Sequence, residues 1–287
     1  MVLTRRTAMY ITMSIAAETE GEYFMKAKEI CALFEEIAPI EIGLQSDRDR
    51  RVLGFRFGNP EINVTGVGVA WYLAMEVIEQ AIRSNLNLLL IHEPGLFYDN
   101  SSPWHTCILQ ETNPVNLRKK QLLIDNDICV YTAHSNWDLQ RSVGMQPTFA
   151  RALGLTDEIK RDIAVGIYRV QTMSFSDLID KVKVATGLKH MRVQGDPGKP
   201  ITVVAVGFGN MGFVTDGITA NNADAGIFGE LGEFSFIAAR EAGLAIIETT
   251  HLVSESIGFH SVVDVMKEKL PNTKIEFLEV PFAYKWV

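Results

Sequence analysis

The stretch VTGVGVAWYLAMEVIEQAIRSNLNLLLIHE, residues 64–93, decides the fold that we expect. Residues 64–70 have the apolar composition of a strand, and residues 73–82 place apolar side chains at helical spacing. Residues 87–91 are continuously apolar, which is typical of a strand covered on both faces. A strand, a helix and a strand in this order predict a parallel sheet with a right-handed crossover.

The same alternation extends over most of the chain. It predicts the fold class α/β, with two similar lobes of mostly parallel sheet flanked by helices and a metal site at the carboxyl ends of the strands. We expect the first lobe over residues 1–160 and the second over residues 161–287, whose last segment could pack back on the first lobe. Residues 42–60 are expected to form a charged loop. Further helices are predicted over 20–37, 114–126, 233–242 and 256–270 and from Ser174 onward, and further strands over 127–133, 201–206, 225–228, 244–248 and 274–280.

The composition narrows the function classes. The chain has 287 residues, 47% of them hydrophobic, so a large core is available and disorder is not expected. A formal net charge of −8 argues against electrostatic binding of nucleic acid, and no apolar stretch reaches the ~18 residues of a membrane span. Cys31, Cys107 and Cys129 do not indicate a disulfide framework, which fits a cytoplasmic protein. Residues 8–17 resemble a weak signal sequence, and a frayed extension is the alternative.

Three groups of potential metal ligands each follow a predicted strand. Two groups have the same spacing, a histidine followed four positions later by a carboxylate, so their side chains share one face if a helix begins there. In open parallel sheets, ligands bind beyond the carboxyl ends of the strands. We therefore predict that the three groups meet in one metal site: His92 with Glu93, His134 with Asp138, and His251 with Glu255.

The types of these side chains indicate which ions the site would hold. Imidazole and carboxylate ligands suit zinc, manganese, iron, cobalt or nickel, and six ligands exceed what one catalytic zinc uses. Two divalent ions bridged by Asp138 and Glu255 would use them all. The alternative is that each histidine is an ordinary polar group satisfied at a strand end. His105, His190 and His260 lack this setting, and we expect them on the surface or in the core.

A glycine motif offers a competing interpretation. Gly207, Gly209 and Gly212 form a GxGxxG pattern after a predicted strand, which is typical of dinucleotide-binding folds. Glu230 lies near the expected place of a ribose-binding acid. The segment 213–222 is a poor amphipathic helix, however, so a tight glycine turn is the alternative.

The ligand groups resemble the pattern of the Nif-three-like dinuclear metal-centre hexameric proteins, often labelled GTP cyclohydrolase I type 2 homologues. That family has His-His-Pro after an apolar strand, then His-x-Asn-x-Asp, and His-x-x-x-Glu near the C-terminus. The corresponding runs here are His92-Glu93-Pro94, residues 134–138 and residues 251–255, and the likeness extends in order from Val64 to the C-terminus. Glu93 stands where the family has its second histidine.

The resemblance implies two α/β lobes and a homohexamer. It implies metal ligands at His92, Asp138, His251 and Glu255, with His134 in or beside the site. The favoured function is a metal-dependent, cyclohydrolase-like hydrolase, in which a water bridges two ions and His134 ligates or shuttles protons, with a small molecule or nucleotide as substrate. Non-catalytic metal storage, delivery or partner docking is the first alternative. An NAD(P)-dependent oxidoreductase using residues 207–212 is the more remote one.

Overall fold

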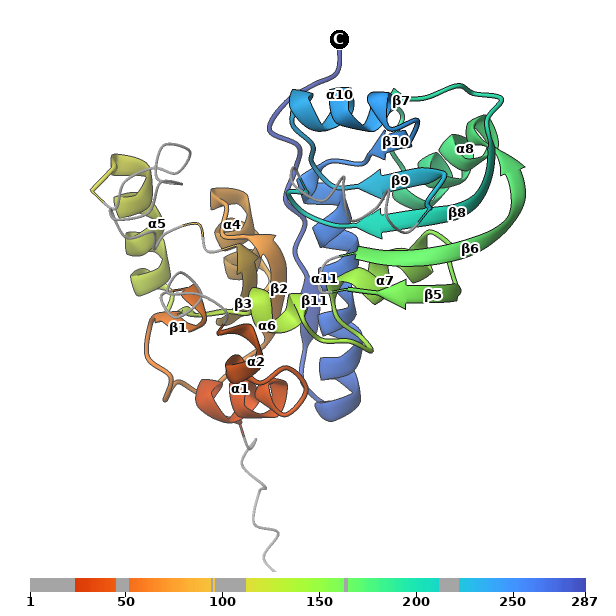
Figure 1. The fold of residues 1–287 in the computed structure, drawn as a ribbon. Helices are drawn as coiled ribbons and strands as arrows, with labels where there is room; N and C mark the ends of the chain where they lie inside the picture. Colours follow the sequence, from red (N-terminus) through yellow and green to blue (C-terminus); the bar gives the residue numbers. More distant parts are fainter. Residues whose placement is uncertain (1–23, 45–51, 94, 96–111, 163–164, 212–221) are drawn as a thin grey trace, which may run out of the picture.

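The structure is a computed structural model that describes residues 24–44, 52–93, 95, 112–162, 165–211 and 222–287. The expectations for residues 1–17, Pro94, His105, Cys107 and Gly212 lie outside these residues. The fold class that the sequence predicts is confirmed, because helices flank two separate sheets (Figure 1).

The first sheet has its strands in the order β1-β4-β3-β2-β11. Its three central strands pair in parallel, as the stretch 64–93 predicts, and β11 adds to them in parallel beside β2, whereas β1 pairs antiparallel with β4. The strands are β1 (Gly54–Phe57), β2 (Val67–Tyr72), β3 (Leu88–Glu93), β4 (Cys129–Thr132) and β11 (Ile275–Phe277).

The loop predicted over residues 42–60 is wrong at β1. The ring of Phe55 lies 5.2 Å from that of Tyr131 on β4, edge to face, and this packing outweighs the charged composition of the segment. The helices around the first sheet are α1 (Ala27–Glu35), α2 (Ile40–Gly43), α4 (Met75–Arg83), α5 (Pro114–Asp125) and α6 (Ser135–Asp138).

The second sheet has its strands in the order β5-β6-β8-β9-β10-β7. Only its three central strands pair in parallel: β8 (Pro200–Gly207), β9 (Ala225–Phe228) and β10 (Ala245–Glu248). The strands on either side of this group, β6 and β7, pair antiparallel with β8 and β10, respectively. The outer strands are β5 (Asp157–Arg161), β6 (Val165–Ser174) and β7 (Arg192–Gln194), and the helices are α7 (Met145–Ala152), α8 (Phe175–Thr186) and α10 (Glu233–Glu241). Ser174 and Asp177 form the capping box of α8, as the sequence predicts.

The long helix α11 (His251–Lys269) runs between the two sheets (Figure 1). The predicted start at Ser256 is wrong, because the hydroxyl of Thr250 accepts a hydrogen bond from Val253 N at 3.3 Å and caps the helix earlier. Phe259 of α11 belongs to one continuous core with Val67 of the first sheet and Val204 of the second. The helix therefore joins the two sheets through a shared apolar interior.

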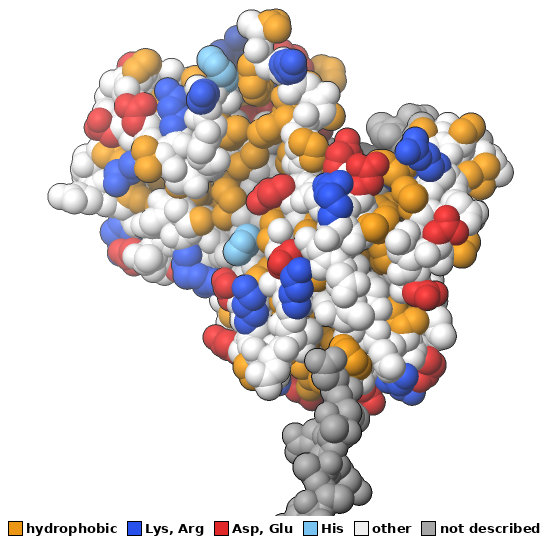
Figure 2. Space-filling view, turned by 180° about the vertical axis from the view of Figure 1, so that it is seen from behind, with side chains coloured by type: hydrophobic (Ala, Val, Ile, Leu, Met, Phe, Trp, Pro, Cys, Tyr) orange, Lys and Arg blue, Asp and Glu red, His pale blue; other side chains and the backbone are white. Residues whose placement is uncertain are grey.

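The surface is mixed in charge. Figure 2 shows basic and acidic side chains interspersed over one face of the molecule. Among the helices of the described residues, none is long and apolar enough to cross a membrane.

We predict that Gly258→Ala destabilises the packing of α11 on α7. A Cβ at Gly258 would overlap Sδ of Met145 and lie 2.9 Å from the Met145 carbonyl oxygen, so backbone must move as well as a side chain. The expected loss in the free energy of unfolding is about 1–3 kcal/mol, measured by denaturant titration. Gly198→Ala is the matched control, because its Cβ would meet only Asp196 Oδ1 at 3.5 Å in an exposed turn. Equal losses in both variants would contradict the packing role of Gly258.

Candidate metal centre

The six side chains singled out from the sequence come from three strand ends and lie together. The end of β3 carries His92 and Glu93, and α6, which follows β4, ends on Asp138, with His134 at its N-cap. The start of α11 carries His251 and Glu255 one turn apart on the same face. Parallel pairing of β3 with β4 brings the first two groups to one sheet edge, and α11 brings the third across from the second sheet.

His92 lies at the centre of the cluster. It is fully buried, and its Nδ1 lies 3.0 Å from the carbonyl oxygen of Ala133, which fixes the proton on Nδ1 when the ring is neutral. Its Nε2 then faces Asp138 Oδ1 at 3.6 Å and Glu255 Oε2 at 3.3 Å, without the alignment of a hydrogen bond to either. In the neutral ring, the buried lone pair of Nε2 therefore faces two carboxylates.

His134 stacks on His92, with ring centroids 4.6 Å apart and an interplanar angle of 11°. Its Nε2 lies 3.3 Å from Glu93 Oε1, and its Nδ1 lies 3.8 Å from Asp138 Oδ2. His134 Nδ1 and Asp138 Oδ1 are both buried without a hydrogen-bond partner. Native proteins rarely leave several such atoms together unless water or an ion satisfies them.

His251 and Glu255 form the third pair. His251 Nε2 lies 3.0 Å from Glu255 Oε2 and 3.8 Å from Glu93 Oε1. The same Glu255 oxygen accepts a hydrogen bond from Trp71 Nε1 at 2.7 Å. Glu255 thus stands between two imidazoles and one indole.

Glu230 and Gly209 contact this pair, although the sequence pattern links them to a dinucleotide site. His251 Nδ1 lies 3.1 Å from Glu230 Oε2, so the acid expected near a ribose instead holds the outer nitrogen of an imidazole. Gly209 has a φ of 62°, and a Cβ there would overlap Glu255 Oε1. Backbone hydrogen bonds from Glu230 N to Gly209 O (2.8 Å) and from Met211 N to Glu230 O (3.0 Å) tie the glycine turn to the end of β9.

Strain marks the start of α11. Thr250, directly before His251, has φ 73° and ψ 151°, a region that β-branched residues avoid. Such a conformation costs about 1–3 kcal/mol and persists only where the surroundings impose it. It turns the chain from β10 into α11 so that His251 faces the cluster.

The carboxylates govern the protonation of the imidazoles. Burial acts to lower the pKa of His92, but Glu255 and Asp138 outweigh it and raise that pKa to about 9. Burial likewise opposes protonation of His251, yet Glu255 and Glu230 raise its pKa to about 11. Burial raises the pKa of Asp138 to about 6, against the pull of the two nearby imidazoles. In the absence of a cation, protons on the histidines therefore balance the acidic groups.

The spacing of the atoms fits a bound cation. Ligand atoms about 2.0–2.2 Å from an ion lie roughly 3.0–3.6 Å from one another around it. The separations between His251, Glu255, His92 and Asp138 fall in this range, at 3.0, 3.3 and 3.6 Å for successive pairs. Two sets of side chains that share His92 could each hold an ion, because within each set the ligand atoms lie within 4.8 Å of one another. The sets are His92, His134 and Asp138, and His92, Glu93 and Glu255.

The other histidines and cysteines of the described residues lie elsewhere. His190 and His260 are exposed and stand beside Trp286 and Phe277, respectively. Cys31 and Cys129 are buried free thiols that contribute no atom to either set.

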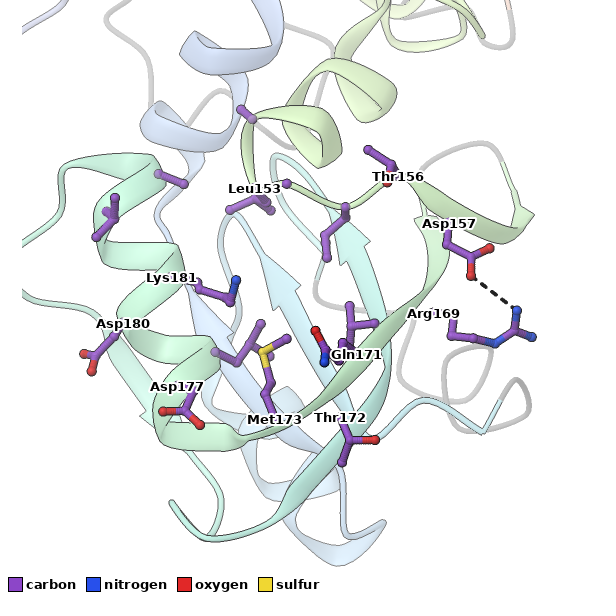
Figure 3. A pocket seen from close by; sticks show the side chains of 17 residues that line it. Leu153, Thr156, Asp157, Arg169, Gln171, Thr172, Met173, Asp177, Asp180 and Lys181 are labelled. Atoms are coloured by element: carbon purple, nitrogen blue, oxygen red, sulfur yellow. Dashed lines mark hydrogen bonds and ion pairs between the residues drawn. The ribbon is translucent and has the colours of Figure 1, made fainter.

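A broad hollow of ≈ 1190 Å³ also lies away from the cluster, beside β6 and α8 (Figure 3). Its charged side chains do not converge on one point. Asp157 pairs with Arg169 at 3.3 Å, and Asp177 caps its own helix through Ser174. The hollow therefore offers no arrangement of groups for chemistry.

Comparisons with known proteins identify the family of the chain. The family model described as Duf34/NIF3 (NGG1p interacting factor 3) matches residues 25–283. A GTP cyclohydrolase 1 type 2 homolog of Clostridium perfringens is 30% identical over 264 residues, which cover 88% of this chain and 95% of the relative. One of Clostridium acetobutylicum is 31% identical over 257 residues, covering 86% and 90%.

A solved structure shows the same fold. The Bacillus cereus protein related to NIF3 superposes with a TM-score of 0.80 at 17% identity, over 92% of this chain and 100% of that one. The family resemblance inferred from the ligand groups is thus confirmed. With a family match that spans nearly all of the described residues, the chain belongs to the Duf34/NIF3 family.

Proposed function

We propose that the cluster binds two divalent metal ions and supports hydrolysis of a small-molecule substrate. The observation that carries the proposal is His92 Nε2, which is buried, lacks a hydrogen-bond partner and faces two carboxylates. An imidazole whose other nitrogen is held by a carbonyl oxygen is the usual form of a metal-ligating histidine.

The geometry supports a division of the ligands between two positions. His92, His134 and Asp138 would hold one ion. Glu93, His251 and Glu255 would hold the other, because Glu93 Oε1 and Glu255 Oε2 both face His251 Nε2. Glu255 also lies next to His92, which makes it the stronger candidate for a bridging ligand.

A pair of such ions supplies water acidified toward neutral pH and an electrophile for the substrate. The residues of the chain contribute orientation and proton handling. Asp138 and Glu255 fix the spacing between the positions, and Glu230 orients His251. His134, whose Nε2 lies 3.3 Å from Glu93 Oε1, is the imidazole that would handle protons where it does not hold an ion.

The metals suited to this donor set are zinc, manganese, iron, cobalt and nickel, because the site offers imidazoles and carboxylates without thiolates. GTP belongs among the substrates to be tested, because relatives carry the cyclohydrolase name. Metal storage or delivery by the same ligands is the second candidate function, since the unpartnered atoms call for a cation whether or not turnover follows.

We predict that His92→Ala and Glu255→Gln lower the metal content of purified protein. His92→Ala removes a ligand atom from the middle of the cluster, and Glu255→Gln removes the negative charge of a ligand there, so at least one position should lose more than about tenfold in affinity. Metal per chain, measured by elemental analysis after dialysis, checks this. The matched controls are His260→Ala and Glu268→Gln, two exposed positions on α11, the helix that carries Glu255. Full metal content in the two site variants would contradict the assignment.

Metal affinity should rise with pH. His92 and His251, with pKa values of about 9 and 11 in the metal-free protein, carry protons at pH 7 and must lose them to bind an ion. The affinity should therefore increase about tenfold per pH unit for each proton released, up to about pH 9. Titration with zinc in weak buffer, followed with a pH indicator, measures the proton release. Zinc uptake without proton release would contradict the exchange of zinc for protons on these two histidines.

Hydrolytic turnover should depend on Asp138. Loading the protein with each candidate metal and screening nucleotides, phosphoesters and amides should identify a substrate, and Asp138→Asn should reduce its turnover at least about 100-fold. Asp264→Asn, an exposed change on α11, is the control and should leave turnover intact. Tight, stoichiometric metal uptake with no turnover on the whole panel would favour storage or delivery instead.

A further inference from the structure

Trp71 contacts both members of the ligand pair on α11 from the opposite sheet. It stands near the end of β2, next to Tyr72, which pairs with Glu93 in register. Its indole Nε1 donates to Glu255 Oε2 at 2.7 Å. Its ring lies 5.6 Å from the ring of His251 at an angle of 61°. A half-buried indole on the first sheet thus touches the metal-ligating face of a helix that follows the second.

The carboxylate of Glu255 is fixed from two sides. The Oε1 atom lies so close to Gly209 that a Cβ there would overlap it. The Oε2 atom is turned toward His92 Nε2 at 3.3 Å, His251 Nε2 at 3.0 Å and the indole. The last torsion of a glutamate side chain is broad, so packing alone does not fix the orientation of the carboxylate plane. The indole hydrogen bond holds that plane with one oxygen toward the imidazoles.

The indole suits this role chemically. It is a neutral donor, so it orients an anionic oxygen without adding a positive charge that would repel a cation. A carboxylate oxygen has two lone-pair directions, and one can accept the indole N–H while the other remains for an ion. Lysine or arginine at this place would compete with the metal.

We propose that Trp71 is a positioning residue of the metal centre, whose indole N–H holds Glu255 Oε2 toward His92 and His251 and whose emission reports the loading of the site. The proposal rests on the proposed binding of metal ions. It adds a residue that is neither a ligand nor part of the sequence pattern that identified the ligands.

The test is Trp71→Phe, which removes the donor and keeps an aromatic ring. Zinc affinity, measured by competition with a chromogenic chelator, should fall about 10–100-fold, the usual cost of losing an outer hydrogen bond to a metal ligand. Trp71→Gln restores an N–H donor and should recover part of that loss. Trp286→Phe is the control, because this exposed indole near the C-terminus packs beside His190 and should leave zinc affinity unchanged.

Fluorescence gives a readout that a merely structural role would not move. Zinc should change the tryptophan emission of the wild type and of Trp286→Phe, and the change should be smaller in Trp71→Phe, where only Trp137 beside Asp138 remains close to the cluster among the described residues. In metal-free protein, Glu255→Gln should also shift the emission, since Trp71 then faces a neutral amide. Emission identical to that of the wild type would contradict the hydrogen bond, and this measurement needs no variant at Trp71.

The outcomes separate the two proposals. If the wild type takes up none of zinc, manganese, iron, cobalt and nickel, the metal centre and the positioning role are both wrong. If the wild type binds zinc and Trp71→Phe binds it equally tightly, the positioning role alone is overturned. A selective loss in Trp71→Phe, with thermal unfolding in chelator close to that of the wild type, supports it.

Discussion

The structure depends on the burial of acidic side chains where α11 passes between the two sheets. Removing an ionised carboxylate from water costs several kcal/mol unless opposite charge and hydrogen bonds compensate, against a net stability of about 5–15 kcal/mol for a typical protein. Glu255 is 4% exposed, and Asp138 and Glu93 lie within the same cluster. Without cations, protons on His92 and His251 offset this cost, which explains why the pKa values of both imidazoles are raised. A divalent cation in place of these protons would offset the same negative charge.

Holding these groups in place requires unusual backbone. Thr250 adopts φ 73° directly before His251, and Gly209 adopts φ 62° against Glu255. Both residues stand just past the carboxyl end of a strand of the second sheet. The surrounding apolar core, with Phe259 of α11 fully buried, holds α11 in position and so maintains this strain. The free-energy cost of the strained backbone at the site is therefore offset by apolar packing elsewhere along α11.

Much of this arrangement follows from the sequence. The apolar run 88–91 and the alternation around it predict β3 and its parallel neighbours, and the repeated spacing of His134 with Asp138 and His251 with Glu255 indicates where ligands gather. Residues held by tertiary contacts are less visible. Strand β1 owes its place to the packing of Phe55 on Tyr131.

The outer partners of the ligands were hidden for a related reason. Trp71 reaches Glu255 across 184 positions of sequence, and nothing in the local pattern of β2 distinguishes it from a packing residue. The sequence indicates a role for Glu230 only through its distance from a glycine motif and not through its contact with His251. Side chains that orient a candidate ligand have no fixed sequence distance from it, because tertiary structure alone brings the two together.

The glycine pattern illustrates how one local device can serve two chemistries. In dinucleotide-binding folds, glycine lets backbone approach a pyrophosphate, whose charge the free N–H groups then meet. Here Gly209 also lets backbone approach an anion, but the anion is the carboxylate of Glu255, and the Gly209 N–H donates to Ser254 Oγ at 3.1 Å. The glycine after β8 is therefore explained by its contact with Glu255 in the candidate metal centre. In both cases the glycine allows the backbone to lie close to a negatively charged group. That group is a bound pyrophosphate in dinucleotide-binding folds and a side chain of the neighbouring helix here.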